Sequence, residues 1–273
     1  MRFAALMQSV PYCGSAPTPA EILTRFNLDP ILIAVLAAVL LLHVRSLRRA
    51  GRAPRALAAA GWLVAAAALI SPLCALSVAL FSARVGQHMV LVLIAAPLIA
   101  AAMPRSLSGA VASPGPPAIA GAEGAEGSPG ALGLWAWTAL FFGALWFWHM
   151  PVPYDATFSS DLVYWSMHLT LFGSAIFLWR ALIHHPRELT AQALAAGALT
   201  FVHMGLLGAI IALGDRPLYA WHLLTTQVWG LTPLEDQQLG GTLMWVPGIA
   251  LFLWSAVRSL SRLWSSLEGA RTA

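Results

Sequence analysis

The run Thr190-Ala-Gln-Ala-Leu-Ala-Ala-Gly-Ala-Leu-Thr-Phe-Val-His-Met-Gly-Leu-Leu-Gly-Ala-Ile-Ile-Ala-Leu213 contains no Asp, Glu, Lys or Arg. A helix of about 20 apolar residues is long enough to cross the hydrocarbon core of a bilayer. Similar runs recur along the 273 residues, of which 59% are hydrophobic and 10% are charged. A membrane β-barrel would need apolar and polar residues to alternate with period two, and this chain lacks that pattern. The composition therefore predicts an integral membrane protein of several helices in contact with the lipid bilayer.

The hydropathy pattern predicts an all-α fold, a polytopic membrane helix bundle with about seven transmembrane helices. We expect a single transmembrane domain over residues 1–273, without a fixed-period repeat. The predicted spans are Pro30–Val44, Ala56–Leu80, Val85–Met103, Leu132–His149, Asp161–Ile183, Thr190–Leu213 and Pro233–Val257.

Arginine supplies all of the basic residues, 15 in number, and cytoplasmic connections of membrane proteins collect positive charge. The sequence therefore predicts that the N-terminus lies outside and the C-terminus lies in the cytoplasm. The predicted cytoplasmic arginines are Arg45, Arg48, Arg49, Arg52, Arg55, Arg105, Arg180, Arg187, Arg258, Arg262 and Arg271, whereas Arg2, Arg25, Arg84 and Arg216 fall on the other side.

Two connections stand out by composition. The stretch 106–131 is rich in Gly, Ala, Pro and Ser, which predicts a flexible cytoplasmic linker. The outer connection Asp215–Leu231 carries Tyr219, Trp221, His222 and Trp229, and we expect it to be a partly amphipathic segment lying at the membrane interface.

The absence of lysine and the spacing of the two cysteines exclude some classes of function. The chain has no lysine, which excludes chemistry through a lysine Schiff base and therefore excludes a seven-helix retinal protein. Cys13 and Cys74 are far apart in the sequence and match no metal-ligand spacing. A disulfide between them is not expected.

The predicted orientation sorts the histidines by side. Four outer helix ends each offer one, at His88, His149, His168 and His203. A rise of about 1.5 Å per residue spreads them over a depth that the side chains of packed helices can bridge. We expect the remaining histidines elsewhere: His43, His184 and His185 on the cytoplasmic side, and His222 in the outer connection.

A thioether lies beside each of the four outer histidines in the sequence. Imidazole with thioether is a ligand set typical of copper, because soft sulfur selects Cu(I) whereas carboxylates suit Mg²⁺ or Ca²⁺. Adjacent helical residues point about 100° apart, so both members of a pair need not face one site. The other interpretation is a set of hydrogen bonds between helices. The pairs are His88-Met89, His149-Met150, Met167-His168 and His203-Met204, and Met244 in the last span adds another thioether.

Local context around two histidines supports a site. Asp161 and His168 fall on one face of their helix, and we expect Asp161 to cap the start of that helix. Pro151 ends the helix that carries His149, so free carbonyls near His149 would favour a bound cation.

The last span begins with a capping box. In a capping box, the side chains of Thr232 at the N-cap and Glu235 three residues later each accept a hydrogen bond from the backbone N–H of the other residue, so Glu235 is structural. Asp236, Gly240 and Met244 then share one stripe, and the glycines allow a close approach. Asp236 is interpreted as a metal ligand or a hydrogen-bonding partner of a ligating histidine, as a complement to the helix dipole, or as a hydrogen-bond partner of the outer connection.

These motifs carry a resemblance. The sequence resembles the polytopic CtaG family of cytochrome c oxidase assembly proteins over about two thirds of its length, with one departure, Arg84-Val85, where the family often has a further His-Met. The matching stretches are Gln87-His88-Met89, Trp148-His149-Met150-Pro151 with Tyr154, His168 with Trp179, Asp236-Gln237-Gln238-Leu239-Gly240-Gly241 and Met244-Trp245-Val246-Pro247-Gly248.

The resemblance implies a factor of the bacterial inner (plasma) membrane and respiratory chain that assists the maturation of a haem-copper oxidase by delivering or holding copper. We therefore expect no enzymatic activity, no nucleic-acid binding, and cytochrome c oxidase subunits and a copper ion as partners. The predicted metal ligands are His88, His149, His168, His203, Asp236 and Met244. Two alternatives stay open: a membrane zinc metallohydrolase and a haem-binding membrane electron carrier.

Overall fold

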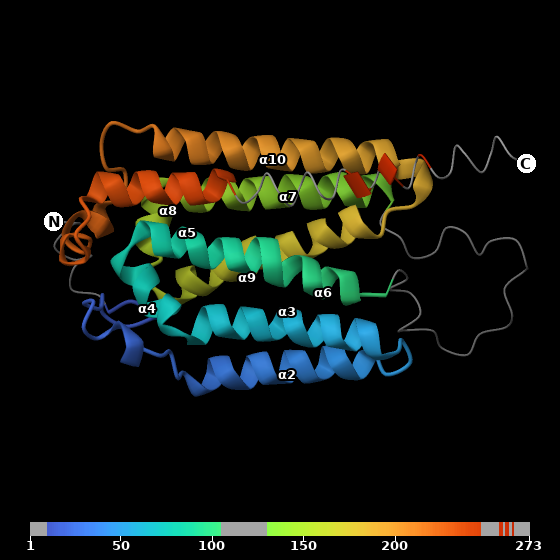
Figure 1. Cartoon of the computed structure of the whole chain (residues 1–273), viewed down its shortest axis with the longest axis horizontal. Helices are drawn as coiled ribbons and strands as arrows, with labels where there is room; N and C mark the ends of the chain where they lie inside the picture. The colour runs from blue at the N-terminus through green and yellow to red at the C-terminus, as the bar shows by residue number, and fades with distance from the viewer. Residues whose placement is uncertain (1–9, 105–129, 247–256, 259, 262–263, 265–273) are drawn as a thin grey trace, which may run out of the picture.

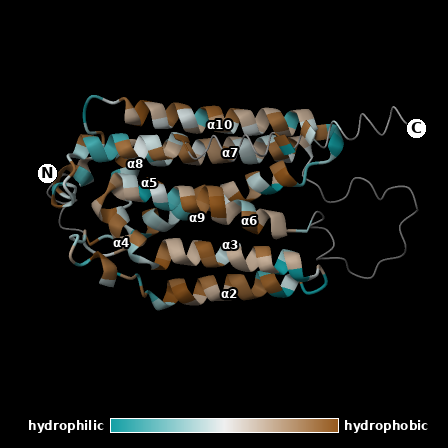
Figure 2. Cartoon of the chain, viewed as in Figure 1, coloured by the Kyte–Doolittle hydropathy of each residue, from teal (hydrophilic) through white to brown (hydrophobic). Residues whose placement is uncertain are grey.

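The computed structural model describes residues 10–104, 130–246, 257–258, 260–261 and 264. Within these residues the chain is all helical, as predicted, with helices that run along one long axis (Figure 1). Five helical segments are long and apolar enough to cross a membrane. Hydrophobic residues occupy these helices along most of their length (Figure 2). The predicted linker 106–131 lies almost entirely outside the described residues.

The first two long helices form a pair at one side of the bundle. A 3-10 turn, Ile22–Thr24, precedes α2 (Pro30–Ser46), which packs against α3 (Arg52–Ile70). Asp29 caps α2 by accepting a hydrogen bond from the Ile31 N–H at 2.9 Å. At 17 residues α2 is shorter than the spanning helices, although it is apolar.

The predicted span Ala56–Leu80 is wrong as one continuous helix. The backbone breaks at Ser71, whose side chain caps the short helix α4 (Pro72–Ala79) through the Leu73 N–H. Pro72 fits the first position of a helix because it lacks the N–H that a continuing helix would need. Leu80 is extended and reverses the chain into α5.

The next span is continuous but not uniform. It consists of α5 (Phe81–Val90), a π-helical turn (Leu91–Ala95) and α6 (Ala96–Ala102). Pro97 follows the π turn and offers no N–H to the preceding carbonyls. The Trp179 indole N–H instead donates to the Val92 carbonyl at 2.8 Å. The span lies between α3 and α9.

The second half of the bundle comprises α7 (Ala131–His149), a short helix α8 (Pro151–Ala156), α9 (Asp161–Ile183) and α10 (Thr190–Ala212). Contacts join α7 to α9 and to α10. Pro151 ends α7 after His149, as predicted. The predicted cap of α9 is wrong by one residue: the Ser160 side chain accepts from the Val163 N–H at 3.4 Å, and Asp161 lies in the first turn.

A last helix begins at residue 233 and continues to 246, where the described stretch ends. The predicted capping box is confirmed. Thr232 donates its N–H to the Glu235 carboxylate at 2.8 Å, and the Glu235 N–H donates to the Thr232 hydroxyl at 3.2 Å. Most of the predicted continuation to Val257 lies outside the described residues, so the total of seven spans stays a prediction.

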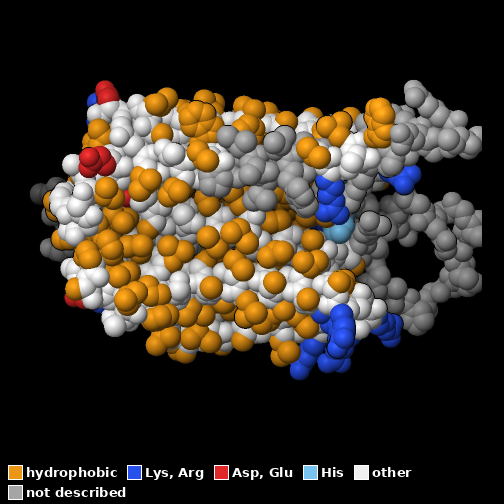
Figure 3. All heavy atoms as spheres, in the orientation of Figure 1, with side chains coloured by type: hydrophobic (Ala, Val, Ile, Leu, Met, Phe, Trp, Pro, Cys, Tyr) orange, Lys and Arg blue, Asp and Glu red, His pale blue; other side chains and the backbone are white. Residues whose placement is uncertain are grey.

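The two ends of the bundle differ in charge. Arginine side chains gather at one end, where α2 meets α3 and α9 meets α10 through a 3-10 turn (Arg187–Leu189), and acidic side chains appear at the other end (Figure 3). This is the grouping that the sequence predicted.

The connection after α10 folds over one end of the bundle. It contains two 3-10 turns, Ala220–Leu224 and Gln227–Trp229. Its place at the membrane interface stays a prediction. Tyr219, Trp221 and His222 are buried. The Trp221 indole donates to the Val78 carbonyl at 2.8 Å, and the Asp155 carboxylate accepts from the Trp221 N–H at 3.3 Å. Residues 213–231 therefore close the end of the bundle opposite the arginine side chains, which is called the outer end after its predicted side.

Candidate functional site

Two of the predicted ligands meet in the interior of the bundle. His88 comes from α5 and His168 from α9, and their ring centroids are 5.2 Å apart with the planes inclined at 72°. Each side chain is only 4% exposed. Residues 80 positions apart in the sequence thus place two imidazoles face to edge in a buried core.

The hydrogen bonds of His168 determine which nitrogen carries the proton. Its Nδ1 lies 3.0 Å from the Tyr164 carbonyl, which can only accept, so Nδ1 bears the hydrogen. The lone pair therefore resides on Nε2, which is buried and has no hydrogen-bond partner among the described residues. His88 Nε2 is likewise buried without a partner there. An imidazole held at one nitrogen by a carbonyl and free at the other is a prepared metal ligand.

His149 has the same tautomer at the C-terminal end of α7. Its Nδ1 lies 2.7 Å from the Leu145 carbonyl, and the side chain is buried. Its own carbonyl accepts a hydrogen bond from the Tyr219 hydroxyl at 3.0 Å. The connection that closes the outer end therefore also fixes the end of α7 that carries this histidine.

His203 has a different environment from this pair. It is half-buried on α10 and stacks on Phe142 of α7, with ring centroids 4.3 Å apart. Trp146 contacts the same imidazole edge-on at 6.2 Å. Ring packing between α7 and α10 holds this imidazole, while its Nδ1 is buried and has no hydrogen-bond partner among the described residues.

The predicted thioethers are buried together. Met89, Met167, Met204 and Met244 all belong to the main hydrophobic core, which also holds Tyr164 and Trp179. Met150 is the exception, because it follows α7 and is exposed. Of the described His, Cys, Asp and Glu side chains, no three lie close enough to hold a metal ion together. Completing a copper site around His88 and His168 would therefore draw on thioether sulfur.

Asp236 caps α5 from a distant part of the chain. Its carboxylate accepts hydrogen bonds from the Phe81 N–H at 2.6 Å, the Ser82 N–H at 3.1 Å and the Ser82 hydroxyl at 2.5 Å. A carboxylate at the first turn satisfies free N–H groups and complements the helix dipole. Asp236 thus positions the helix that presents His88, while a direct ligand role for it stays a prediction.

The glycines next to Asp236 allow the last helix to lie against two others. A Cβ at Gly240 would stand 2.4 Å from the Phe81 ring, and one at Gly241 would stand 2.5 Å from the Ala212 backbone of α10. Gln237 accepts from the Leu218 N–H at 2.6 Å and donates to the Ile211 carbonyl at 3.2 Å. This motif is the junction of α5, α10 and the outer connection.

Arg84 is a part of the site that sequence reasoning noted only as a departure. It is 1% exposed and lies one turn before His88 on α5. Its guanidinium carbon stands 4.0 Å from the Phe158 ring centroid and 5.9 Å from that of Tyr164. One nitrogen donates to the Thr157 hydroxyl, while Nε and Nη2 have no hydrogen-bond partner among the described residues. A fixed positive charge is therefore buried beside the histidine pair.

The outer end near Arg84 also holds His222. The Tyr154 hydroxyl lies 2.7 Å from His222 Nε2, while His222 Nδ1 faces the Ala79 carbonyl at 3.3 Å. Burial, together with the positive charge of Arg84, lowers the pKa of His222 to about 3. His222 is therefore neutral, donates a hydrogen bond from Nδ1 and accepts one from the Tyr154 hydroxyl at Nε2.

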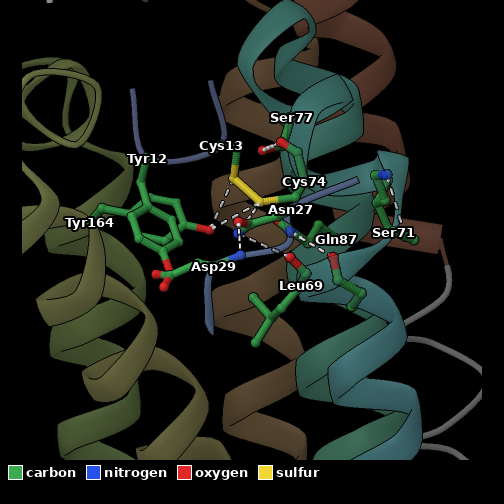
Figure 4. Close-up of a disulfide and its surroundings, with 12 residues drawn as sticks. Tyr12, Cys13, Asn27, Asp29, Leu69, Ser71, Cys74, Ser77, Gln87 and Tyr164 are labelled. Atoms are coloured by element: carbon green, nitrogen blue, oxygen red, sulfur yellow. Dashed lines mark hydrogen bonds between the residues drawn. A yellow bond between two sulfur atoms is a disulfide. The ribbon is translucent and has the colours of Figure 1, made fainter. Parts of the chain in front are cut away.

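The cysteines overturn one expectation from the sequence. Cys13 and Cys74 form a disulfide with a Cα–Cα distance of 5.5 Å (Figure 4). Sequence separation misled the prediction, because residues 10–17 fold back over the outer end and bring Cys13 to α4. Both sulfurs also face the Tyr164 hydroxyl, at 3.4 Å and 3.8 Å.

His168 also lines an apolar cavity. The cavity has a volume of about 460 Å³ and lies between α2, α3 and α9. Trp62, Trp165 and Phe172 contribute aromatic walls, and Tyr12 and Asp29 lie at its outer end.

A comparison with protein families matches residues 37–266 to the model described as cytochrome c oxidase caa3 assembly factor (Caa3_CtaG). The chain belongs to this family. Neither curated proteins nor solved structures give a match. All six predicted ligands lie inside the matched region, as do Cys74 and Arg84, whereas Cys13 precedes it. The resemblance drawn from the sequence motifs is thereby confirmed at the level of the family.

Proposed function

We propose that this member of the caa3 assembly factor family is a non-enzymatic protein that binds copper between α5 and α9 and holds or delivers it for a haem-copper cytochrome c oxidase. The observation that carries the proposal is the buried pair of His88 and His168, whose Nε2 atoms have no partner among the described residues. Unpaired buried nitrogens are costly in a membrane helix unless a ligand uses them.

We propose His88 and His168 as the primary ligands. His149 does not join them in the described geometry, in which no three His, Cys, Asp or Glu side chains are close enough to hold one metal ion, so its ligand role stays a prediction. The thioethers of the core, including Met244, are candidates to complete the set. Imidazole with thioether favours monovalent copper. In this proposal Asp236 and His203 act by positioning α5 and α10.

Arg84 supports the monovalent state. Side chains at positions i and i+4 of a helix are neighbours, so a metal held by His88 would lie near the buried guanidinium of Arg84. Repulsion between the two charges grows in proportion to the charge of the metal, so this position favours a monovalent ion over a divalent one.

For orientation, we infer that the outer end of the bundle faces the periplasmic side of a bacterial inner membrane. The arginine-rich end fits the cytoplasm, and a disulfide fits an oxidising compartment. With the last helix continued beyond residue 246, this arrangement gives seven spans, an outer N-terminus and a cytoplasmic C-terminus.

The copper site is tested on purified protein. His88→Ala or His168→Ala should lower the affinity for Cu(I) by at least about tenfold, because each removes a direct ligand. His184→Ala and His185→Ala at the arginine-rich end are matched controls and should leave it nearly unchanged. Equal losses in both groups would refute the assignment.

The role in assembly is tested in cells. Cells without the protein should make oxidase polypeptides and haem but show low oxidase activity, and added copper should partly restore that activity by mass action. Normal activity of deletion cells under copper limitation would rule out delivery. Stoichiometric zinc without copper, or a haem absorption band in the purified protein, would instead favour the alternatives.

A further inference from the structure

The Cys13–Cys74 disulfide has surroundings that favour its opening. Cys74 is fully buried and is the third residue of α4, in the first turn. A thiolate in the first turn of a helix is stabilised by the helix dipole. This is the position at which a cysteine makes a good leaving group in thiol–disulfide exchange.

Two side chains also donate hydrogen bonds to the sulfurs (Figure 4). The Asn27 amide donates to Cys74 Sγ at 3.5 Å. The Tyr164 hydroxyl contacts Cys13 Sγ at 3.4 Å, and it must be the donor because a disulfide sulfur carries no hydrogen. Both donors would strengthen their bonds to a thiolate, since hydrogen bonds to charged acceptors are about twice as strong as neutral ones.

Cys13 carries the sulfur that an incoming reductant can reach. It is half-buried, and with Tyr12, Gly14, Arg25 and Asn27 it lines a polar hollow of about 470 Å³ at the outer end. The Arg25 guanidinium donates to the Ser15 carbonyl at 2.8 Å, on the segment next to Cys13. A cation in this hollow would attract the thiolate of an incoming reductant.

We propose that Cys13 and Cys74 form a redox-active pair whose dithiol form is a binding site for monovalent copper, separate from the histidines. A thiolate of a dithiol reductant attacks Cys13 Sγ and expels Cys74 as a thiolate. The second thiol of the reductant then attacks the mixed disulfide, which releases Cys13 and leaves the reductant oxidised. Two electrons pass to the pair, and the cysteines take up the two protons that the reductant loses.

The geometry of the reduced pair suits a soft cation. Two thiolates on one metal ion stand roughly 4.5 Å apart, which is twice a metal–thiolate bond of about 2.3 Å. A Cα–Cα distance of 5.5 Å accommodates this separation by rotation of the side chains. Thiolates select Cu(I) among available metals, and binding releases the two thiol protons. Copper as the cargo rests on the proposed function, whereas the opening of the disulfide does not.

Tyr164 connects this pair with the proposed histidine site. Its hydroxyl touches both sulfurs, and its ring lies 4.3 Å from the His168 ring, centroid to centroid. Cys13 is on the outer hollow and His168 is in the bundle core. The dithiol therefore stands between the outer solution and the buried pair, where a metal ion would first be captured.

The test compares the intact disulfide with protein reduced anaerobically by dithiothreitol or tris(carboxyethyl)phosphine and then freed of reductant, each titrated with Cu(I) against a chromogenic chelator. The reduced protein should bind about one more Cu(I) per chain, with sulfur ligands in the X-ray absorption spectrum. Reduced chain blocked with iodoacetamide should lose that increment, as should Cys74→Ser. If Cys74→Ser folds poorly, the reduced wild-type chain blocked with iodoacetamide still tests the proposal.

The opening itself is tested with dithiothreitol, a dithiol reductant. Asn27→Ala should slow the release of Cys74 by about tenfold, because it removes one donor to the leaving thiolate. Ser77→Ala is the matched control, since the Ser77 hydroxyl bonds to the Cys74 carbonyl at 2.7 Å and not to its sulfur. Equal rates in both variants, or a disulfide that opens only after denaturation, would overturn the proposal.

The two proposed copper sites can be refuted independently of each other. Loss of copper from the oxidised His88→Ala protein with a preserved increment on reduction supports both. An unchanged Cu(I) count on reduction overturns the dithiol site and leaves the histidine site standing. A chain that binds Cu(I) only after reduction refutes the histidine site alone.

Discussion

Replacing Asp236 by Asn removes the charge from the cap of α5 while it conserves the shape of the side chain. The native carboxylate accepts three hydrogen bonds, from the Phe81 N–H, the Ser82 N–H and the Ser82 hydroxyl. An amide has one oxygen, so at least one buried N–H of α5 would face an NH₂ donor instead of an acceptor. Hydrogen bonds to a charged acceptor contribute about 1.5–3 kcal/mol, and an unsatisfied buried donor costs about 1–3 kcal/mol.

We therefore expect Asp236→Asn to lower the free energy of unfolding by about 3 kcal/mol. Thermal unfolding in detergent, followed by tryptophan fluorescence, measures this loss. Glu235→Gln is the matched control: its carboxylate bonds to Thr232 at the exposed start of the last helix and not to α5, so a loss of about 1 kcal/mol or less is expected.

Copper per folded chain separates the interpretations of Asp236. A cap that positions α5 predicts less folded protein but nearly normal copper in the fraction that folds. A ligand, or a hydrogen-bonding partner of a ligating histidine, predicts normal abundance with weakened copper binding. Asp236→Asn protein with wild-type stability and no copper would refute the capping interpretation.

The remaining predictions concern orientation and pH. In intact spheroplasts, a membrane-impermeant maleimide should label Cys13 or Cys74 only after treatment with an impermeant reductant, and labelling that also requires lysis would reverse the orientation. The pKa of His222 is held at about 3 by burial, whereas an unfolded histidine titrates near 6.5. The unfolded state therefore binds more protons between these values, so stability should fall as pH falls from about 6.5 towards 3, by up to about 1.4 kcal/mol per pH unit. His222→Gln should reduce that slope between pH 7 and 5 in unfolding midpoints, and an unchanged slope would show that His222 does not contribute.

Periodicity and composition predicted the helices well because membrane spans must be apolar along their whole length. Thr190–Leu213 matches α10 almost to the residue, and Pro151 ended α7 where its missing N–H requires. The break at Ser71 escaped prediction because α4 is as apolar as the helix before it. Hydropathy predicts which segments are apolar, but it does not predict where the backbone changes direction within an apolar segment.

The candidate site was predictable only in part. Side and depth placed His88, His168 and His203 in one set of predicted ligands. The structure brings the rings of His88 and His168 together, whereas the ring of His203 stacks on Phe142, and the ligand role of each stays a prediction. The disulfide was missed because contact between Cys13 and Cys74 depends on how residues 10–17 fold over the outer end. Such long-range contacts leave no periodic signal in a single sequence.

The most distinctive motif of the chain, Asp236 to Gly241, illustrates why polar groups in a membrane helix need not be ligands. Polar groups in hydrocarbon must be paired, and here the partners are the backbone groups of neighbouring elements: Asp236 takes the N–H groups of α5, and Gln237 takes those around residue 218. Gly240 and Gly241 permit the close approach that these bonds require. A reversal such as that at Leu80 exposes the first N–H groups of α5, and a carboxylate from the last helix satisfies them. The motif thus supports His88 from two turns away, which links the end of the chain to the histidine pair without direct contact.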